Sequence, residues 1–184
     1  MVDSVKQVSA LTRVAPIRTA AASAEAEKFL RFQLGAEGKA LLPVNIISQV
    51  MRVLGADILP VPQMPGCVLG IYNWRGEMLW LVDIGQLMGF PALCEPSVGK
   101  AGVGGDLMAI AIQINGQYLG LVVSQISDIE LHDIQQIQVP SIGLFSPEIM
   151  PYLQGYLVAA NNEVLMVLNA EALAQAPLWK KFQS

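Results

Sequence analysis

Short apolar stretches separated by turn residues dominate the chain and predict strands rather than long helices. Residues 29–34 alternate imperfectly, with Arg31 and Gln33 on one face, as in a strand that is half buried. The "GAEG" turn leads into a second predicted strand, residues 39–44, which is closed by Pro43. The chain therefore opens with a strand, a turn and a strand.

The next stretch, "NIISQVMRVL" at 45–54, begins at Asn45, a residue suited to cap a helix, and predicts a short helical turn. Pro60, Pro62 and Pro65 follow and exclude a central strand, because proline cannot donate to a sheet ladder.

Residues 70–84, "GIYNWRGEMLWLVDI", form the most distinctive stretch, with two apolar runs on either side of Arg75-Gly76. Gly76 suits a tight hairpin turn, which places Arg75 at the tip. Asp83 followed three residues later by Gln86 is typical of a helix start. A hairpin and a brief helix are predicted here.

The same pattern recurs after a Gly-rich segment, Leu93–Asp106, which we interpret as a linker or long loop. Residues 107–127 give strand, "NGQ" turn and strand, and residues 153–173 can be laid on 68–88 with one extra residue in the turn. The aligned pairs are Gly155 with Gly70, Glu163 with Glu77, Asn169 with Asp83, and Leu173 with Leu87.

This repeat predicts two small β units side by side. Short strands avoid exposed edges by closing into barrels, and a pair of barrels leaves a groove between them. We expect a tail at 1–26, one domain at 27–176 and a second tail at 177–184. Within the domain the halves are about 28–92 and 107–175, and an exchange of edge strands between them is allowed.

The composition of the chain limits the classes of function that fit it. Charged residues make up 14% and apolar residues 53% of the chain, so we expect either apolar surface for partners or a surface rich in neutral polar groups. The net charge is −4 without a basic run, which argues against nucleic acid. Cys67 and Cys94 are too few for a disulfide framework and favour a reduced, cytoplasmic setting.

Membrane segments are not expected. Arg13 and Arg18 interrupt the start of the chain, which is therefore interpreted as a flexible tail and not as a signal peptide. The uncharged window Leu107–Ser127 is long enough to span a bilayer, but its central "NGQ" favours two strands of a hairpin.

Groups for catalysis or metal binding are sparse. His132 is the sole histidine and lies in sequence beside Glu130 and Asp133, which is compatible with a general base or with an ordinary solvated histidine. One histidine and two distant cysteines do not make a zinc site. "GKAGVGG" at 99–105 lacks the Ser or Thr of a phosphate loop and is interpreted as linker. No catalytic residue, metal or cofactor is predicted.

The chain resembles the CheW-like family, the coupling proteins of bacterial chemosensory arrays, from about residue 28 to 175. The resemblance is carried by "LLPVNIISQV", by "GIYNWRGEMLWLVDI" with its Arg75-Gly76, and by the two segments that begin at Asp106 and Tyr152. It implies a mainly β fold of two pseudo-symmetric, SH3-like five-stranded barrels with short helices.

The resemblance also implies a non-catalytic adaptor in chemotaxis, phototaxis or type IV pilus motility. Such proteins join the cytoplasmic tip of methyl-accepting receptors to the regulatory domain of a CheA-type histidine kinase, by helix-in-groove and barrel-to-barrel contacts. A cytoplasmic location with recruitment to receptor arrays follows, without direct membrane insertion. Nothing in the sequence indicates a homo-oligomer.

The family pattern suggests which residues bind proteins. Val44 and Ile47 are anchors or core residues on the receptor side, and Val122 and Val123 hold the same place in the second half. The second group of predicted protein-binding residues is the hairpin, Asn73, Trp74, Arg75 and Gly76. Trp74 is either an anchor for a partner or a core residue. Arg75 is either simply solvated or organises a contact surface. The family's usual glutamate opposite this arginine is Gln49 here, so a hydrogen bond would replace an ion pair.

Two alternatives stay open. The chain could be a related module that binds a small ligand or another partner in the groove between the barrels. It could also be an enzyme, for example a hydrolase that uses His132.

Overall fold

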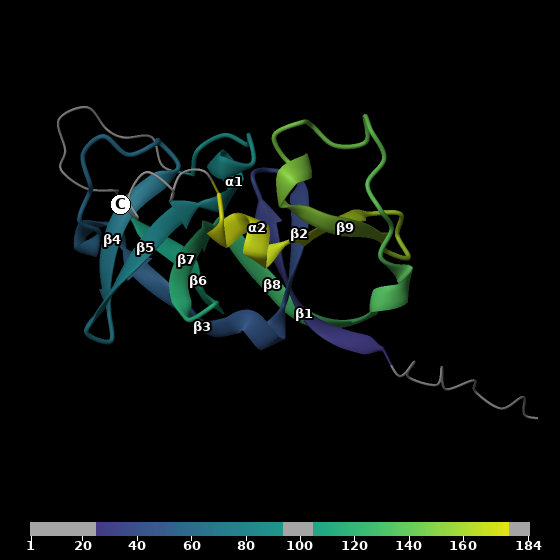
Figure 1. Cartoon of the computed structure of the whole chain (residues 1–184), viewed down its shortest axis with the longest axis horizontal. Helices are drawn as coiled ribbons and strands as arrows, with labels where there is room; N and C mark the ends of the chain where they lie inside the picture. Colours follow the sequence, from purple (N-terminus) through teal and green to yellow (C-terminus); the bar gives the residue numbers. More distant parts are fainter. Residues whose placement is uncertain (1–24, 94–104, 177–184) are drawn as a thin grey trace, which may run out of the picture.

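The computed structural model describes residues 25–93 and 105–176, which fold into two five-stranded sheets that lie side by side (Figure 1). Sheet A has the order β8 (Gln125–Asp133), β1 (Ala26–Leu34), β2 (Gly38–Pro43), β10 (Val164–Leu168) and β9 (Leu153–Val158). Sheet B has the order β3 (Ile47–Leu54), β6 (Asp106–Ile114), β7 (Gln117–Val123), β5 (Glu77–Asp83) and β4 (Val68–Trp74). The predicted pair of five-stranded β units is confirmed.

The two sheets repeat one topology. In order across the sheets, β3, β6, β7, β5 and β4 of sheet B correspond to β8, β1, β2, β10 and β9 of sheet A. Each strand therefore has its counterpart five strands away in the chain. Each sheet contains one parallel pair, β10 with β2 and β5 with β7, while the other pairs are antiparallel. The internal repeat seen in the sequence is therefore a repeat of structure as well.

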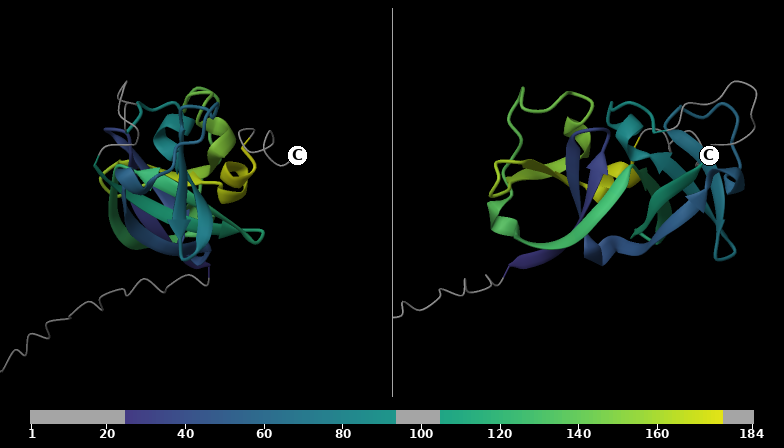
Figure 2. Two further views of the ribbon diagram at one scale, coloured as in Figure 1. Left: turned by 90° about the vertical axis from the view of Figure 1, so that its left-hand side faces the viewer. Right: turned by 180° about the vertical axis from the view of Figure 1, so that it is seen from behind.

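Each sheet takes strands from both halves of the chain. β1 and β2 belong to sheet A, and the short 3-10 turn η1 (Val44–Ile46) carries the chain across to β3 in sheet B. The second half crosses in the opposite sense between β7 and β8. Neither sheet is thus built from residues 28–92 or 107–175 alone, and the rear view in Figure 2 shows the same side-by-side arrangement.

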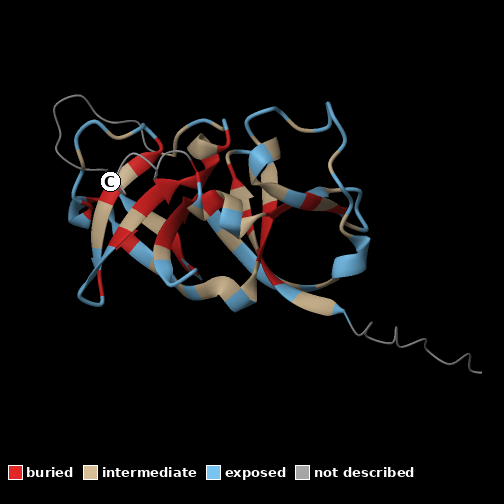
Figure 3. Ribbon diagram, viewed as in Figure 1, coloured by how far each residue is buried: buried red, intermediate tan, exposed pale blue. Residues whose placement is uncertain are grey.

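Three hydrophobic clusters follow from the alternation of side chains along the strands. The largest, here called the seam, lies between the sheets and includes Phe32, Leu42, Ile110 and Leu121. Residues one position away point into the interior of sheet B, such as Ala109 and Ala111 together with Trp74 and Leu81. Phe29, Leu41, Leu157, Leu165 and Val167 fill the interior of sheet A. Buried residues accordingly concentrate in the strands at the middle of the molecule (Figure 3).

Two short helices, α1 (Ile84–Leu87) and α2 (Ala170–Ala174), follow β5 and β10 at equivalent places. The side chain of Asp83 accepts from the backbone N–H of Gln86, and that of Asn169 accepts from the N–H of Ala172. Both predicted caps are confirmed.

The predicted helical turn at 45–54 is wrong. Only η1 is helical, it is capped by Pro43 without a side-chain bond, and the Asn45 amide instead donates to Glu27 Oε1. Residues 47–54 form β3, whose side chains alternate between more and less buried and which pairs with β6. Pairing with the distant strand β6 therefore decides the conformation of residues 47–54, and the capping signal of Asn45 does not.

Three predicted segments lie wholly or largely outside the described residues: the tail at 1–26, the linker at 93–106 and the tail at 177–184. Among the residues that are described, no helix is long and apolar enough to cross a membrane. The window 107–127 forms β6, β7 and the start of β8, as the hairpin interpretation predicts.

Candidate protein-binding site

The tip of the β4–β5 hairpin is a tight turn with both central residues at positive φ. Arg75 has φ 56° and Gly76 has φ 85°, the left-handed conformation that two-residue hairpin turns require. The Asn73 side chain accepts from the backbone N–H of Gly76 at 3.1 Å and fixes the turn. Three of the four predicted hairpin residues thus shape the tip itself.

Gln49 on β3 connects to this hairpin although 26 residues separate it from Arg75. Its Oε1 accepts from Arg75 Nη2 at 2.8 Å and from Trp74 Nε1 at 3.0 Å. β3 and β4 are the two edge strands of sheet B, so one amide oxygen joins the edges of the sheet. The sequence-based pairing of Arg75 with Gln49 is present as a hydrogen bond.

Trp74 is a core residue rather than an exposed anchor. It is 7% exposed and its ring makes an edge contact with Tyr118, with centroids 5.0 Å apart at 63°. Arg75 Cζ lies 4.9 Å from the Trp74 ring centroid, within the range of a cation–π contact. The Trp74 ring thus packs against the Arg75 guanidinium and helps to hold it in place.

Arg75 therefore presents an exposed cation that is held at a fixed place. Its described partners, the Gln49 amide and the Trp74 ring, orient the guanidinium without neutralising it. Such a group suits an anionic or carbonyl-rich partner surface, which guanidinium recognises with its planar fork.

The four valine and isoleucine positions predicted for protein binding divide into two groups. Val44 and Ile47 are partly buried, lie at the crossing from sheet A to sheet B and pack against the seam. Val122 and Val123 are 0% and 3% exposed, so their side chains are core groups of sheet B and of the seam. Only the first pair retains side-chain surface that a partner could contact.

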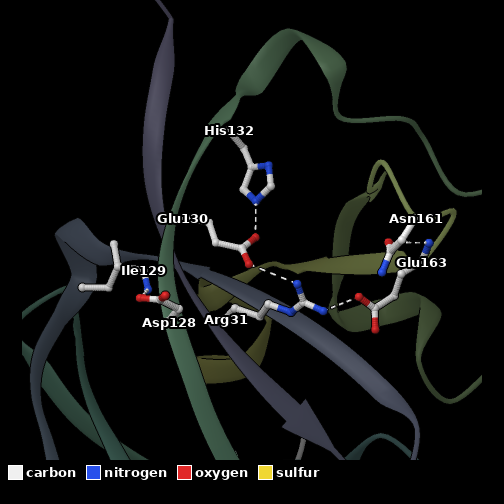
Figure 4. Close-up of polar contacts among 7 residues, drawn as sticks. All are labelled: Arg31, Asp128, Ile129, Glu130, His132, Asn161 and Glu163. Carbon is white, nitrogen blue, oxygen red and sulfur yellow. Dashed lines mark hydrogen bonds and ion pairs between the residues drawn. The ribbon is translucent and has the colours of Figure 1, made fainter.

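His132 belongs to a polar network at the open edge of sheet A (Figure 4). Arg31 donates to Glu130 Oε1 at 3.0 Å and also contacts Glu163, while His132 Nε2 lies 2.8 Å from Glu130 Oε2. Burial alone would raise the pKa of the Glu130 carboxyl, but its hydrogen bonds with Arg31 and His132 outweigh burial and lower it.

The network joins elements in the way that Gln49 does in sheet B. Glu130 is on β8, an edge strand, and Glu163 is in the connection from β9, the other edge strand. Arg31, the centre of this network, was not predicted as a site residue, because its partners are 99 and 132 residues away in the sequence. The one local indication of a role for Arg31 was its position on the same strand face as Gln33.

The histidine contacts are those of a structural group. The His132 ring also packs edge-on against Phe29, with centroids 6.0 Å apart. Within the described residues, no group of three or more His, Cys, Asp or Glu is placed to hold a metal. Cys67 is buried, and burial raises the pKa of its thiol, which makes it a poor nucleophile.

Comparison with known proteins decides the family. A family profile described as the CheW-like domain matches residues 28–177, most of the chain and both sheets. The chain belongs to the CheW-like family.

Two curated relatives share the CheW-like sequence pattern. The "Chemotaxis protein CheW" of Rhizobium meliloti (strain 1021) is 30% identical over 125 residues, which are 67% of this chain and 74% of that protein. The "Protein FrzA" of Myxococcus xanthus is 28% identical over 167 residues, covering 88% and 94% respectively.

A solved structure shares the CheW-like fold. The scaffolding protein TtCheW from Thermoanaerobacter tengcongensis superposes with a TM-score of 0.61 at 22% identity, over 78% of this chain and 88% of that one. The likeness supports the arrangement of two five-stranded units described above.

Proposed function

We propose that this CheW-like protein is a non-catalytic adaptor that couples methyl-accepting receptors to a CheA-type histidine kinase. The pathway is chemotaxis, phototaxis or pilus motility, and the protein acts in the cytoplasm at receptor arrays. The observation that carries this proposal is the family match from 28 to 177, together with the hydrogen-bonded Arg75 hairpin at the point where the family motif is most specific.

The proposed contact surface has two parts that β3 connects. One part is the β4–β5 tip with Arg75, and the other is the crossing at Val44 and Ile47 that leads into β3. Gln49 lies on β3 and binds the tip directly, so the two parts are held to each other by a hydrogen bond.

Binding to the regulatory domain of the cognate kinase tests the proposal. Full-length protein is titrated in biolayer interferometry against immobilised domain of the CheA-type kinase encoded nearest to it. We expect saturable binding, and an absence of binding at about 50 µM would count heavily against the adaptor role.

Arg75→Ala is the informative variant, with Arg52→Ala as its matched control. Both remove an exposed cation, but Arg52 is on the face of β3 opposite Gln49, and its described ion-pair partner is Asp106, at 4.0 Å. We expect Arg75→Ala to weaken kinase or receptor binding about tenfold or more, and Arg52→Ala to leave it nearly unchanged. Equal effects would remove the hairpin from the proposed surface.

Val44→Asp tests the second part of the surface. A variant with unchanged circular dichroism and melting temperature but lost receptor binding supports an anchor role. A variant that unfolds shows that Val44 serves mainly the seam, against which it packs. Val139→Asp, at a site that is 82% exposed, is the control for the added charge.

A further inference from the structure

A pocket of about 400 Å³ lies where α2 meets sheet B. α2 lies between the two sheets (Figure 1). Its last residue, Ala174, lines one wall of the pocket. Lining residues from the β5 and β6–β7 strands include Glu77, Met78, Trp80, Ile114 and Tyr118, and Ala174 comes from α2. The pocket is large enough for a tryptophan-sized group with a neighbouring side chain.

The lining defines the chemistry of an occupant. The walls are mainly apolar and aromatic, and Met78 is 77% exposed, so a large apolar surface faces the pocket. Among the described lining residues, Glu77 is the one charged group and none is Lys or Arg. A group that combines aromatic or aliphatic surface with positive charge is therefore complementary, since an aromatic contact and a carboxylate would both be satisfied.

The chain itself carries such a group directly after the pocket wall. α2 ends at Ala174, and Ala176, the last described residue, is 1% exposed. The following sequence, 177–184, is "PLWKKFQS", which contains Leu178, Trp179 and Phe182 beside two lysines. Trp179 is three residues beyond Ala176, a reach of about 10 Å of extended chain.

We propose that residues 177–184 dock into this pocket, with the Trp179 ring against Met78 and the lysines beside Glu77. Burial of one indole and one carboxylate–lysine contact would hold the segment, and its direct connection to α2 keeps the effective concentration high. Because Glu77 and Met78 directly follow the Arg75-Gly76 turn, the docked segment borders the proposed partner surface. The inference does not depend on that surface, and its test needs neither kinase nor receptor.

Methionine methyl NMR of the full-length protein tests the docking. The Met78 signal is assigned by Met78→Leu and then compared between the native chain and Trp179→Ala. We expect Trp179→Ala to shift the Met78 methyl resonance, because the ring current of the indole is removed. Gln183→Ala, in the same segment but without a ring, should leave the signal in place.

A second pair of variants tests the charge contact. Glu77→Lys should move the Met78 signal part of the way towards its Trp179→Ala position, because two lysines would then face a third cation. Glu37→Lys, in the exposed β1–β2 turn, is the matched control and should have no effect.

Two results would overturn the proposal. The first is a Met78 signal that is the same in Trp179→Ala and in the native chain. The second is a difference that grows with protein concentration, because a contact within one chain is independent of concentration and one between two copies is not.

Discussion

Gly70 allows β4 to pass very close to the loop that follows β3. A Cβ at this position would lie 2.2 Å from the carbonyl oxygen of Leu59, and φ is +141°. Leu59 and Ile71 exchange two backbone hydrogen bonds of 2.9 Å there, so the loop cannot easily withdraw. Gly155 is the equivalent in sheet A, where a Cβ would lie 2.7 Å from the oxygen of Gln138.

We therefore expect Gly70→Ala to lower the free energy of unfolding by about 3 kcal/mol, measured by urea denaturation. Gly116→Ala is the control, because φ there is also positive (+79°) but no atom lies within 4 Å of the added Cβ. It should cost only about 1 kcal/mol, for the left-handed backbone alone. Equal losses for both variants would mean that the close approach to Leu59 does not constrain the fold.

Gln49 offers a second test at the scale of one residue. Gln49→Ala leaves the indole N–H of Trp74, a largely buried residue, without its described acceptor, and should cost about 1–2 kcal/mol. Gln49→Glu keeps an acceptor and adds an ion pair with exposed Arg75, so it should be neutral or stabilise by less than about 1 kcal/mol. Melting curves at low and high salt check both, since only the Glu variant should become less stable relative to the native protein as salt is added.

At the scale of elements, the two helix caps differ in burial and in the number of bonds they make. Asp83 is fully buried and accepts from the N–H groups of Gln86 at 3.0 Å and Leu93 at 2.7 Å. The side chain of Asn169, its counterpart, accepts from the N–H of Ala172 alone among its described bonds. Asp83→Ala should therefore cost about 2–3 kcal/mol in chemical denaturation and Asn169→Ala about 1. A larger loss for Asn169→Ala would contradict this ranking.

These caps and the two hairpins could be predicted because their signals are local. Arg75-Gly76 and Asn115-Gly116 have the positive φ values that such turn sequences favour. The β3 strand could not be predicted from its own residues, because Asn45 suggested a cap while the strand is specified by pairing with β6 about 60 positions later. The burial of Trp74, Val122 and Val123 likewise depends on neighbours that only the fold brings together.

At the scale of the whole molecule, the symmetry of the backbone is not matched by its interiors. Sheet B buries Trp74 between its edges, with Gln49 as acceptor. Sheet A has no aromatic residue in the corresponding β9–β10 connection, "AANNE", and Arg31 with its two glutamates occupies the edge instead. The edge strands of sheet B are thus joined through an indole and a neutral amide, and those of sheet A through charged groups, so acid should weaken the edge contact of sheet A first.

The sign of this effect follows from the pKa of Glu130, which is lowered in the folded protein by Arg31 on β1 and His132 on β8, against the effect of burial. A carboxyl with a lowered pKa stabilises the fold above its unfolded value of about 4.3, and this contribution is lost as the pH falls through the folded value. Below about pH 4 the native state should therefore lose stability, as protonation of Glu130 removes the negative charge that faces Arg31 and His132.

Urea midpoints measured between pH 7 and pH 3 check this expectation. Glu130→Gln should be less stable than the native protein at pH 7, and the difference should shrink as the pH falls, because protonation removes the same charge from native Glu130. Glu37→Gln, in the exposed β1–β2 turn, should run parallel to the native curve throughout. If Glu130→Gln also ran parallel, the charge on Glu130 would contribute nothing to closing sheet A, and the Arg31–Glu163 contact would have to bear that role alone.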